Sequence, residues 1–202
     1  MLWPWSSPAQ LIALRSPDLL LRLPQIGDYP AWSGLRKASR PFLKPFEPRW
    51  TEADLAHSVF ATRVKRARQE AEDGTDYSFL IFNLANGSET LVGGVTLSNI
   101  RRRAAQFVNL GYWMGQQFAG QGLMTKAVAL TLPFVFESCD LHRIHAAFLP
   151  GNIASRRVLE KNGFIEEGFA AGYLQIDGRW EDHVLFGLTR ERYELRRHGR
   201  KA

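Results

Sequence analysis

The residues of this chain best suited to bind a ligand form a short loop with two glycines, Gln117-Phe118-Ala119-Gly120-Gln121-Gly122. Residues 107–114, before the loop, are rich in aromatic and β-branched types and predict a strand, whereas apolar residues from Leu123 onward repeat at helical spacing. The loop should therefore lie at a helix N-terminus, where amide groups lack partners and the helix dipole is positive. Because glycine tolerates positive φ and lets a ligand approach closely, the pattern predicts pyrophosphate binding by the backbone.

The order of residues in this loop fits Q/R-x-x-G-x-G/A, which resembles the acetyl-coenzyme A (acetyl-CoA) loop of the GCN5-related N-acetyltransferases (GNAT). It does not fit a P-loop, since no Lys-Ser/Thr pair follows the last glycine, nor a dinucleotide fingerprint, since no acidic residue ends a second strand at the required spacing. The resemblance implies acetyl-CoA as co-substrate. It also implies an α/β fold with a mixed, mainly antiparallel sheet whose central strands splay apart.

A second segment, residues 152–164, resembles the N-x-x-S…G-F segment of the same family. Residues 42–48 and 173–183 are similar to the ribosomal-protein-alanine N-acetyltransferases in particular. The likeness covers residues 18–190. It implies an N-acetyltransferase domain over that range, with an N-terminal extension at 1–17 and a basic tail at 191–202.

The resemblance also implies roles for individual residues. Ser155 would lie near the thioester sulfur and help to protonate the leaving thiolate, Asn152 would contact the pantetheine arm, and strand amides around Trp113 would polarise the thioester carbonyl. From the residues alone, Asn152 is a good turn residue and Ser155 a good helix starter, and without the resemblance capping is the favoured role of both. The implied cofactor-binding set is Trp113, Met114, Gln117, Phe118, Ala119, Gly120, Gln121, Gly122, Asn152 and Ser155.

The general base is less obvious, because Asn109 and Leu174 stand where related ribosomal-protein acetyltransferases often carry glutamates. Its place would fall to residues of the last hairpin, and we expect a catalytic set of Ser155, Tyr173 and Asp182. The remaining alternatives are Glu181 and His183.

The missing carboxylate favours an acceptor that is easily deprotonated. An α-amine has a pKa of about 7.7 to 8.0 and a lysine amine of about 10.4, so a weak base suffices only for the first. The expected reaction is direct acetyl transfer, in a ternary complex, to the N-terminal Ala or Ser of a ribosomal protein. A small-molecule amine is the alternative acceptor.

Composition limits other functions. The 202 residues predict one domain, and the single cysteine, Cys139, cannot form an internal disulfide. We expect a cytoplasmic protein without a membrane segment, and the oligomeric state stays open. No metal is expected, because strand alternation would send His142 and His145 to opposite faces of a sheet.

The net charge of +6 includes arginines at 101–103 and near the C-terminus. These charges could provide an electrostatic contact to the ribosome, or they could simply be solvated ends of the chain. A nucleic-acid-binding module is a distant alternative, because no aromatics alternate with the basic residues.

The expected elements follow the order β-α-α-β-β-β-α-β-α-β-β. Strands are predicted at 18–23, 77–84, 91–97, 105–114, 142–149, 173–176 and 183–189. Helices are predicted at 28–36, 51–73, 123–139 with a bend at Pro133, and 154–162. Asn86-Gly87 and Asp177-Gly178 predict hairpin turns. The proline-rich segment 41–48 is expected to form one wall of a substrate groove.

Overall fold

The computed structural model describes residues 12–199. Its centre is an eight-stranded sheet in the order β1-β2-β3-β4-β5-β6-β8-β7. The strands are β1 Ala13–Arg15, β2 Leu19–Arg22, β3 Tyr77–Asn83, β4 Thr90–Arg101, β5 Phe107–Met114, β6 Arg143–Phe148, β7 Ile165–Ile176 and β8 Arg179–Thr189. The helices are α1 Tyr29–Ala38, α2 Arg40–Leu43, α3 His57–Asp73, α4 Leu123–Pro133, α5 Ile153–Lys161 and α6 Arg190–Gly199.

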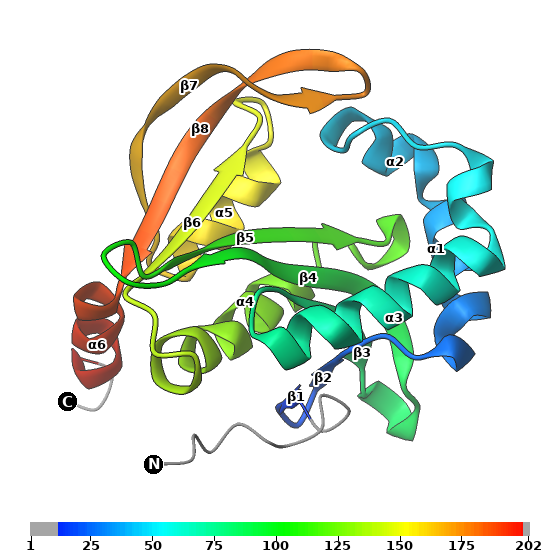
Figure 1. Ribbon diagram of the computed structural model, residues 1–202, viewed down its shortest axis with the longest axis horizontal. Helices are drawn as coiled ribbons and strands as arrows, with labels where there is room; N and C mark the ends of the chain where they lie inside the picture. The colour runs from blue at the N-terminus through cyan, green and yellow to red at the C-terminus, as the bar shows by residue number, and fades with distance from the viewer. Residues whose placement is uncertain (1–11, 200–202) are drawn as a thin grey trace.

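The two central strands, β5 and β6, are the only parallel neighbours among the described strands. They pair over three positions, from Phe107↔Arg143 to Asn109↔His145, and then diverge (Figure 1). Past this point β5 continues along β4, while β6 continues along β8 to Phe148. The predicted mixed, mainly antiparallel sheet with splayed central strands is confirmed.

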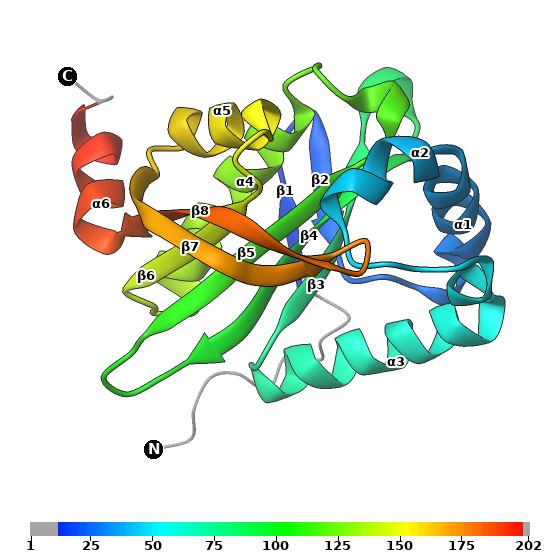
Figure 2. The same cartoon turned by 90° about the horizontal axis from the view of Figure 1, so that it is seen from above.

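Helices cover both faces of the sheet (Figure 2). On one face, α4 packs its fully buried Ala127 and Val128 into the larger core. On the other, Trp32 of α1 and Phe60 of α3 pack into a smaller core, with ring centroids 4.8 Å apart. The sheet is therefore packed between two helical layers, each with its own apolar core.

Most predicted elements are present, and several sequence signals are confirmed. The Thr51–Asp54 capping box forms, Gly74 ends α3 with φ +66°, and Asp177-Gly178 makes the β7–β8 turn with φ +43° and +85°. The capping box, however, begins a short 3₁₀ turn, Glu52–Leu55, and α3 starts only at His57 because Ala56 is extended.

The hairpin predicted at Asn86-Gly87 forms, since β3 and β4 pair antiparallel on either side of it, but its connection is longer than a two-residue turn. Strand β3 ends at Asn83 and β4 begins at Thr90, and a 3₁₀ turn at Ala85–Gly87 lies between them. The Leu84 amide donates to the carbonyl of Asp18, which directly precedes β2, at 2.8 Å. Neighbouring-strand contacts of this kind are not visible in a local turn motif.

Three segments have more regular structure than the sequence indicated. Ala13–Arg15, expected to be part of an extension, adds a short edge strand to β2. The last hairpin is much longer than predicted, since β7 begins at Ile165 and β8 at Arg179. Where a basic tail was expected, α6 packs on the domain: the Tyr193 ring stacks on Phe136 at 4.9 Å.

Candidate active site

The glycine loop connects β5 to α4 as predicted. Gly120 and Gly122 both have φ +77°, a conformation that L-residues rarely adopt. Open space lies where a Cβ would stand at either position. Within residues 12–199, no hydrogen bond has the amide of Gly120, Gln121 or Gly122 as donor. The loop thus presents free amides at the N-terminus of a helix, which suits the phosphate oxygens of acetyl-CoA.

A cavity of about 390 Å³ extends from this loop to α5 and α2. The predicted cofactor-binding residues that line it are Trp113, Met114, Phe118, Ala119, Gly120, Gly122, Asn152 and Ser155. Arg157 and Lys161 of α5 also line it, although neither belongs to the predicted set. Their spacing of one helical turn could have revealed them, because i and i+4 side chains share a helix face. Two cations beside free amides favour an anionic ligand.

Gln117 and Gln121 do not line the cavity, and both side chains are exposed. The Gln121 side-chain amide donates to the Gln117 carbonyl at 2.9 Å. This bond closes the loop on itself. The two glutamines therefore stabilise the conformation of the loop, whereas the two glycines keep its amides accessible to a ligand.

Asn152 begins α5, and its Oδ1 accepts a hydrogen bond from the Ser155 amide at 3.0 Å. The capping role considered for Asn152 is confirmed, while the one considered for Ser155 is wrong. The Ser155 hydroxyl instead lies 2.7 Å from the hydroxyl of Tyr112 on β5, and either atom could be the donor. This contact joins α5 to the strand that precedes the glycine loop.

Tyr112 is a site residue that the sequence analysis did not select. Burial raises the pKa of its phenol to about 12, while the hydrogen bond to Ser155 acts in the opposite direction. The phenol is therefore protonated at neutral pH and can donate a proton. Tyr112 directly precedes Trp113, the first residue of the predicted cofactor-binding set, and this position could have indicated its role. An aromatic residue in a strand is, however, more often a core residue.

A second, smaller cavity of about 100 Å³ lies in the gap between the splayed strands. Gly111 and Tyr112 line it from β5 and Ala147 from β6, and Ser155 and His183 also face it. We call this cavity the slot. Tyr112 and Ser155 line both cavities, so the slot and the larger cavity meet at the hydroxyl pair.

The other two expected catalytic residues lie outside both cavities. Tyr173 is 45% exposed, and its ring centroid lies 5.7 Å from that of His183. The Asp182 carboxylate accepts from the Gly172 amide at 2.8 Å, within an irregular stretch of β7 between Ala170 and Leu174. Of the expected catalytic set, only Ser155 reaches the place where the cavities meet.

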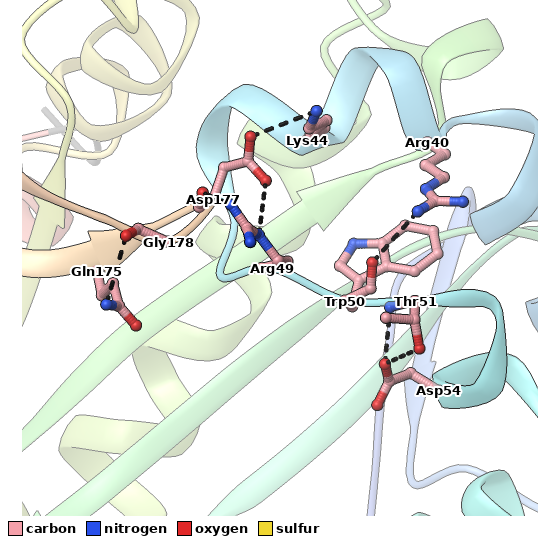
Figure 3. A network of polar contacts seen from close by, with 9 residues as sticks. All are labelled: Arg40, Lys44, Arg49, Trp50, Thr51, Asp54, Gln175, Asp177 and Gly178. Carbon is pink, nitrogen blue, oxygen red and sulfur yellow. Dashed lines mark hydrogen bonds and ion pairs between the residues drawn. The ribbon is translucent and has the colours of Figure 1, made fainter.

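The last hairpin reaches across the slot and touches the proline-rich segment. Asp177, at the hairpin tip, lies between Lys44 at 3.4 Å and Arg49 at 3.6 Å (Figure 3). The Asp177 amide also donates to the Glu47 carbonyl at 2.9 Å. Two segments separated by more than a hundred residues are thus joined into a continuous arch, and Phe46 of this arch lines both cavities.

Within the arch, the Glu47 carboxylate holds the proline-rich segment in place. Both of its oxygens accept from Arg36 at 2.6 Å, and Trp50 donates its indole N–H at 3.0 Å. The Arg36 guanidinium lies 4.9 Å from the ring centroids of both Trp50 and Trp113. Because Trp113 is also part of the cavity wall, this cluster ties the arch to β5.

Cys139 is unsuited to carry an acetyl group. It is buried beyond the end of α4, and burial raises the pKa of its thiol to about 11. A thiol with so little thiolate at neutral pH is a poor nucleophile. In the part of the chain that the structure describes, no three His, Cys, Asp or Glu side chains are grouped as metal ligands, and no helix is long and apolar enough to span a membrane.

Comparisons with known proteins agree with this geometry. Residues 18–165 match the family described as "Acetyltransferase (GNAT) domain". The chain is 33% identical over 177 residues to the probable N-acetyltransferase YjcK of Bacillus subtilis, covering 87% of this chain and 96% of the relative. It is 33% identical over 180 residues to the ribosomal protein uS5-alanine N-acetyltransferase of Escherichia coli, covering 88% and 91%.

Among solved structures, RimJ of Mycobacterium smegmatis in complex with CoA-disulfide superposes with a TM-score of 0.81 at 34% identity, covering 94% of each chain. The family match spans the glycine loop, α4 and the strands that splay beside them. The protein is therefore an acyltransferase enzyme, and the chain belongs to the GNAT family of acetyltransferases.

Proposed function

We propose that this enzyme transfers the acetyl group of acetyl-CoA to the α-amine of a protein N-terminus, that of a ribosomal protein beginning with Ala or Ser. The observation that carries the proposal is the meeting of the two cavities at Tyr112 and Ser155. One cavity suits acetyl-CoA, and the slot is small enough to favour a short first side chain. The likeness to the uS5-alanine N-acetyltransferase supports this acceptor class.

Each residue of the site has a separate role in the proposed reaction. The amides of Gly120 to Gly122 bind the pyrophosphate, and Arg157 and Lys161 supply positive charge beside them. The acceptor amine attacks the thioester carbonyl directly, without an acetyl-enzyme intermediate. As the carbon–sulfur bond breaks, the Ser155 hydroxyl delivers a proton to the sulfur, and Tyr112 hydrogen-bonds to Ser155 throughout.

An N-terminal amine fits the chemistry of the slot better than lysine does. No carboxylate lines the slot among the described residues. A lysine amine, with a pKa of about 10.4, would need a strong base in that place, whereas an α-amine near 7.7 to 8.0 needs only a weak one.

The acceptor class is tested by comparing kcat/KM for three kinds of acceptor at pH 7: Ala- or Ser-starting peptides, the same peptides with a blocked N-terminus and an internal lysine, and small amines. We expect the free N-terminal peptides to be preferred over the blocked ones by a factor of about a hundred or more, from the difference in neutral amine. A small amine that exceeds every peptide by orders of magnitude would instead establish the alternative acceptor class.

A contact with the ribosome would be electrostatic and therefore sensitive to salt. Part of the basic charge of α6 is already paired, since Arg190 lies 2.6 Å from Asp140, and Arg197 pairs with Glu137. The exposed Arg192 is better placed to meet a polyanion. Activity on an assembling ribosomal particle should fall at least about tenfold between 50 and 200 mM salt, while activity on a free peptide should change little.

The matched variants for this test are Arg192→Gln on α6 and Lys65→Gln on the exposed side of α3. Only the first should weaken activity on the particle at low salt, and neither should alter activity on the peptide. Equal, salt-insensitive rates on both acceptors would remove the docking proposal and leave the acceptor assignment standing.

A further inference from the structure

His183 is a buried imidazole whose two nitrogens have different surroundings. The residue lies on β8 and is 3% exposed. Its Nδ1 is 2.9 Å from the carbonyl oxygen of Glu181. Because a carbonyl oxygen can only accept, this contact assigns the hydrogen to Nδ1. The neutral ring then carries its lone pair on Nε2.

The free nitrogen faces the slot. His183 is among the residues that line this cavity, together with Tyr112 and Ser155. Within residues 12–199, every side-chain nitrogen or oxygen that is fully buried has a hydrogen-bond partner. The only hydrogen bond of the imidazole is made by Nδ1, so Nε2 has no partner and cannot be fully buried. The Nε2 atom is therefore not sealed in the protein but open to the slot.

The groups packed around the imidazole leave it as the strongest base in the slot. Tyr112 of β5 is a protonated phenol, and Asn152 and Ser155, at the start of α5, are neutral. Phe46 approaches from the arch, and Tyr173 of β7 packs its ring edge-on against the imidazole. No Asp, Glu, Lys or Arg side chain of the described residues lines the slot.

We propose that His183 is the general base of the reaction and takes the proton of the acceptor's α-ammonium on Nε2. This assignment rests on the proposed function. It replaces the roles expected for Tyr173 and Asp182, which become positioning residues. Asp182 holds the Gly172 amide in the irregular stretch of β7, where Gly172 has φ +54°, and this stretch presents the Tyr173 ring to His183.

The step balances with the groups present. One N–H bond of the ammonium breaks, its proton bonds to Nε2, and the electron pair left on nitrogen attacks the thioester carbonyl carbon. When the carbon–sulfur bond breaks, Ser155 gives a proton to the sulfur and recovers one from the nitrogen of the new amide. The products are the acetylated amine, the free thiol of CoA and one proton, which the His183 imidazolium releases to solvent.

The test uses the full-length chain with His183→Gln and His183→Ala, acetyl-CoA and an Ala-starting peptide. Gln can still donate to the Glu181 carbonyl, which preserves the local structure if Ala does not. At pH 7 we expect kcat to fall on the order of 10²- to 10⁴-fold, with unchanged calorimetric affinity for acetyl-CoA. Since an α-amine near 7.7 to 8.0 deprotonates by itself at higher pH, the defect should shrink towards pH 9.5, and added imidazole should restore part of the rate to His183→Ala.

The matched control is His142→Ala, which removes an imidazole that is 47% exposed and lies outside the slot; it should behave as the unaltered enzyme. A defect of equal size at pH 7 and 9.5, without rescue by imidazole, would overturn the assignment. If the unaltered enzyme acetylates small amines and no peptide, the proposed function fails. The same pH series on a small amine then still decides the role of His183.

Discussion

Replacement of Gly122 by Val should abolish acetyl-CoA binding, with no saturation in calorimetry at millimolar ligand. Gly122 caps the N-terminus of α4 at φ +77° and lines the larger cavity, and the new side chain would occupy space that no protein atom fills. A branched side chain there would occupy the approach of the pyrophosphate. The same φ also strains any residue with a Cβ, so the free energy of unfolding should fall by about 1–3 kcal/mol.

Gly87→Val separates these two effects. Gly87 has φ +71°, lies in the β3–β4 turn, and has no atom within 4 Å of the point where a Cβ would stand. Its stability should fall by a similar amount while its acetyl-CoA affinity stays unchanged. Retained affinity in a folded Gly122→Val protein would show that the loop does not hold the pyrophosphate.

Removal of either hydroxyl of the Tyr112–Ser155 pair should lower kcat by a factor on the order of 10² or more, with little change in the KM for acetyl-CoA. Both Ser155→Ala and Tyr112→Phe break the 2.7 Å contact that positions the Ser155 hydroxyl, which protonates the departing sulfur. Because the two hydroxyls act as one unit, the double variant should be scarcely slower than the worse single variant.

The effect of each substitution on stability distinguishes a catalytic role of this pair from a structural one. Ser155 does not cap α5, whereas Asn152 does, and Asn152→Ala should cost about 1 kcal/mol of unfolding free energy through the lost cap. If Ser155→Ala and Tyr112→Phe lowered only the melting temperature and left kcat unchanged, the pair would be a structural link between β5 and α5. Full additivity of the two kcat losses would contradict the joint action of the two hydroxyls.

Features of this protein whose chemistry is local could be predicted from the sequence alone. Gly120 and Gly122 adopt the positive φ that their spacing before a helix required, and Asp177-Gly178 makes the predicted turn. These features depend on residues that are neighbours along the chain, so backbone sterics and helix ends suffice to predict them. The acetyltransferase resemblance depended on the same local motifs, and with it came the splayed strands, which the pairing of β5 and β6 confirms.

Which side chains share the reaction site depends instead on tertiary contacts. The Tyr112–Ser155 contact joins residues 43 positions apart. In the arch, Asp177 contacts Lys44 and Arg49. Next to the irregular stretch of β7, the residue that faces the slot is His183, and not Tyr173 or Asp182. Successive side chains of a strand alternate between the two faces of the sheet, so His183 and Asp182 on β8 cannot both face the slot, and the residues inserted into β7 decide where Tyr173 points. That irregularity depends on cross-strand contacts, which no local pattern of residues specifies.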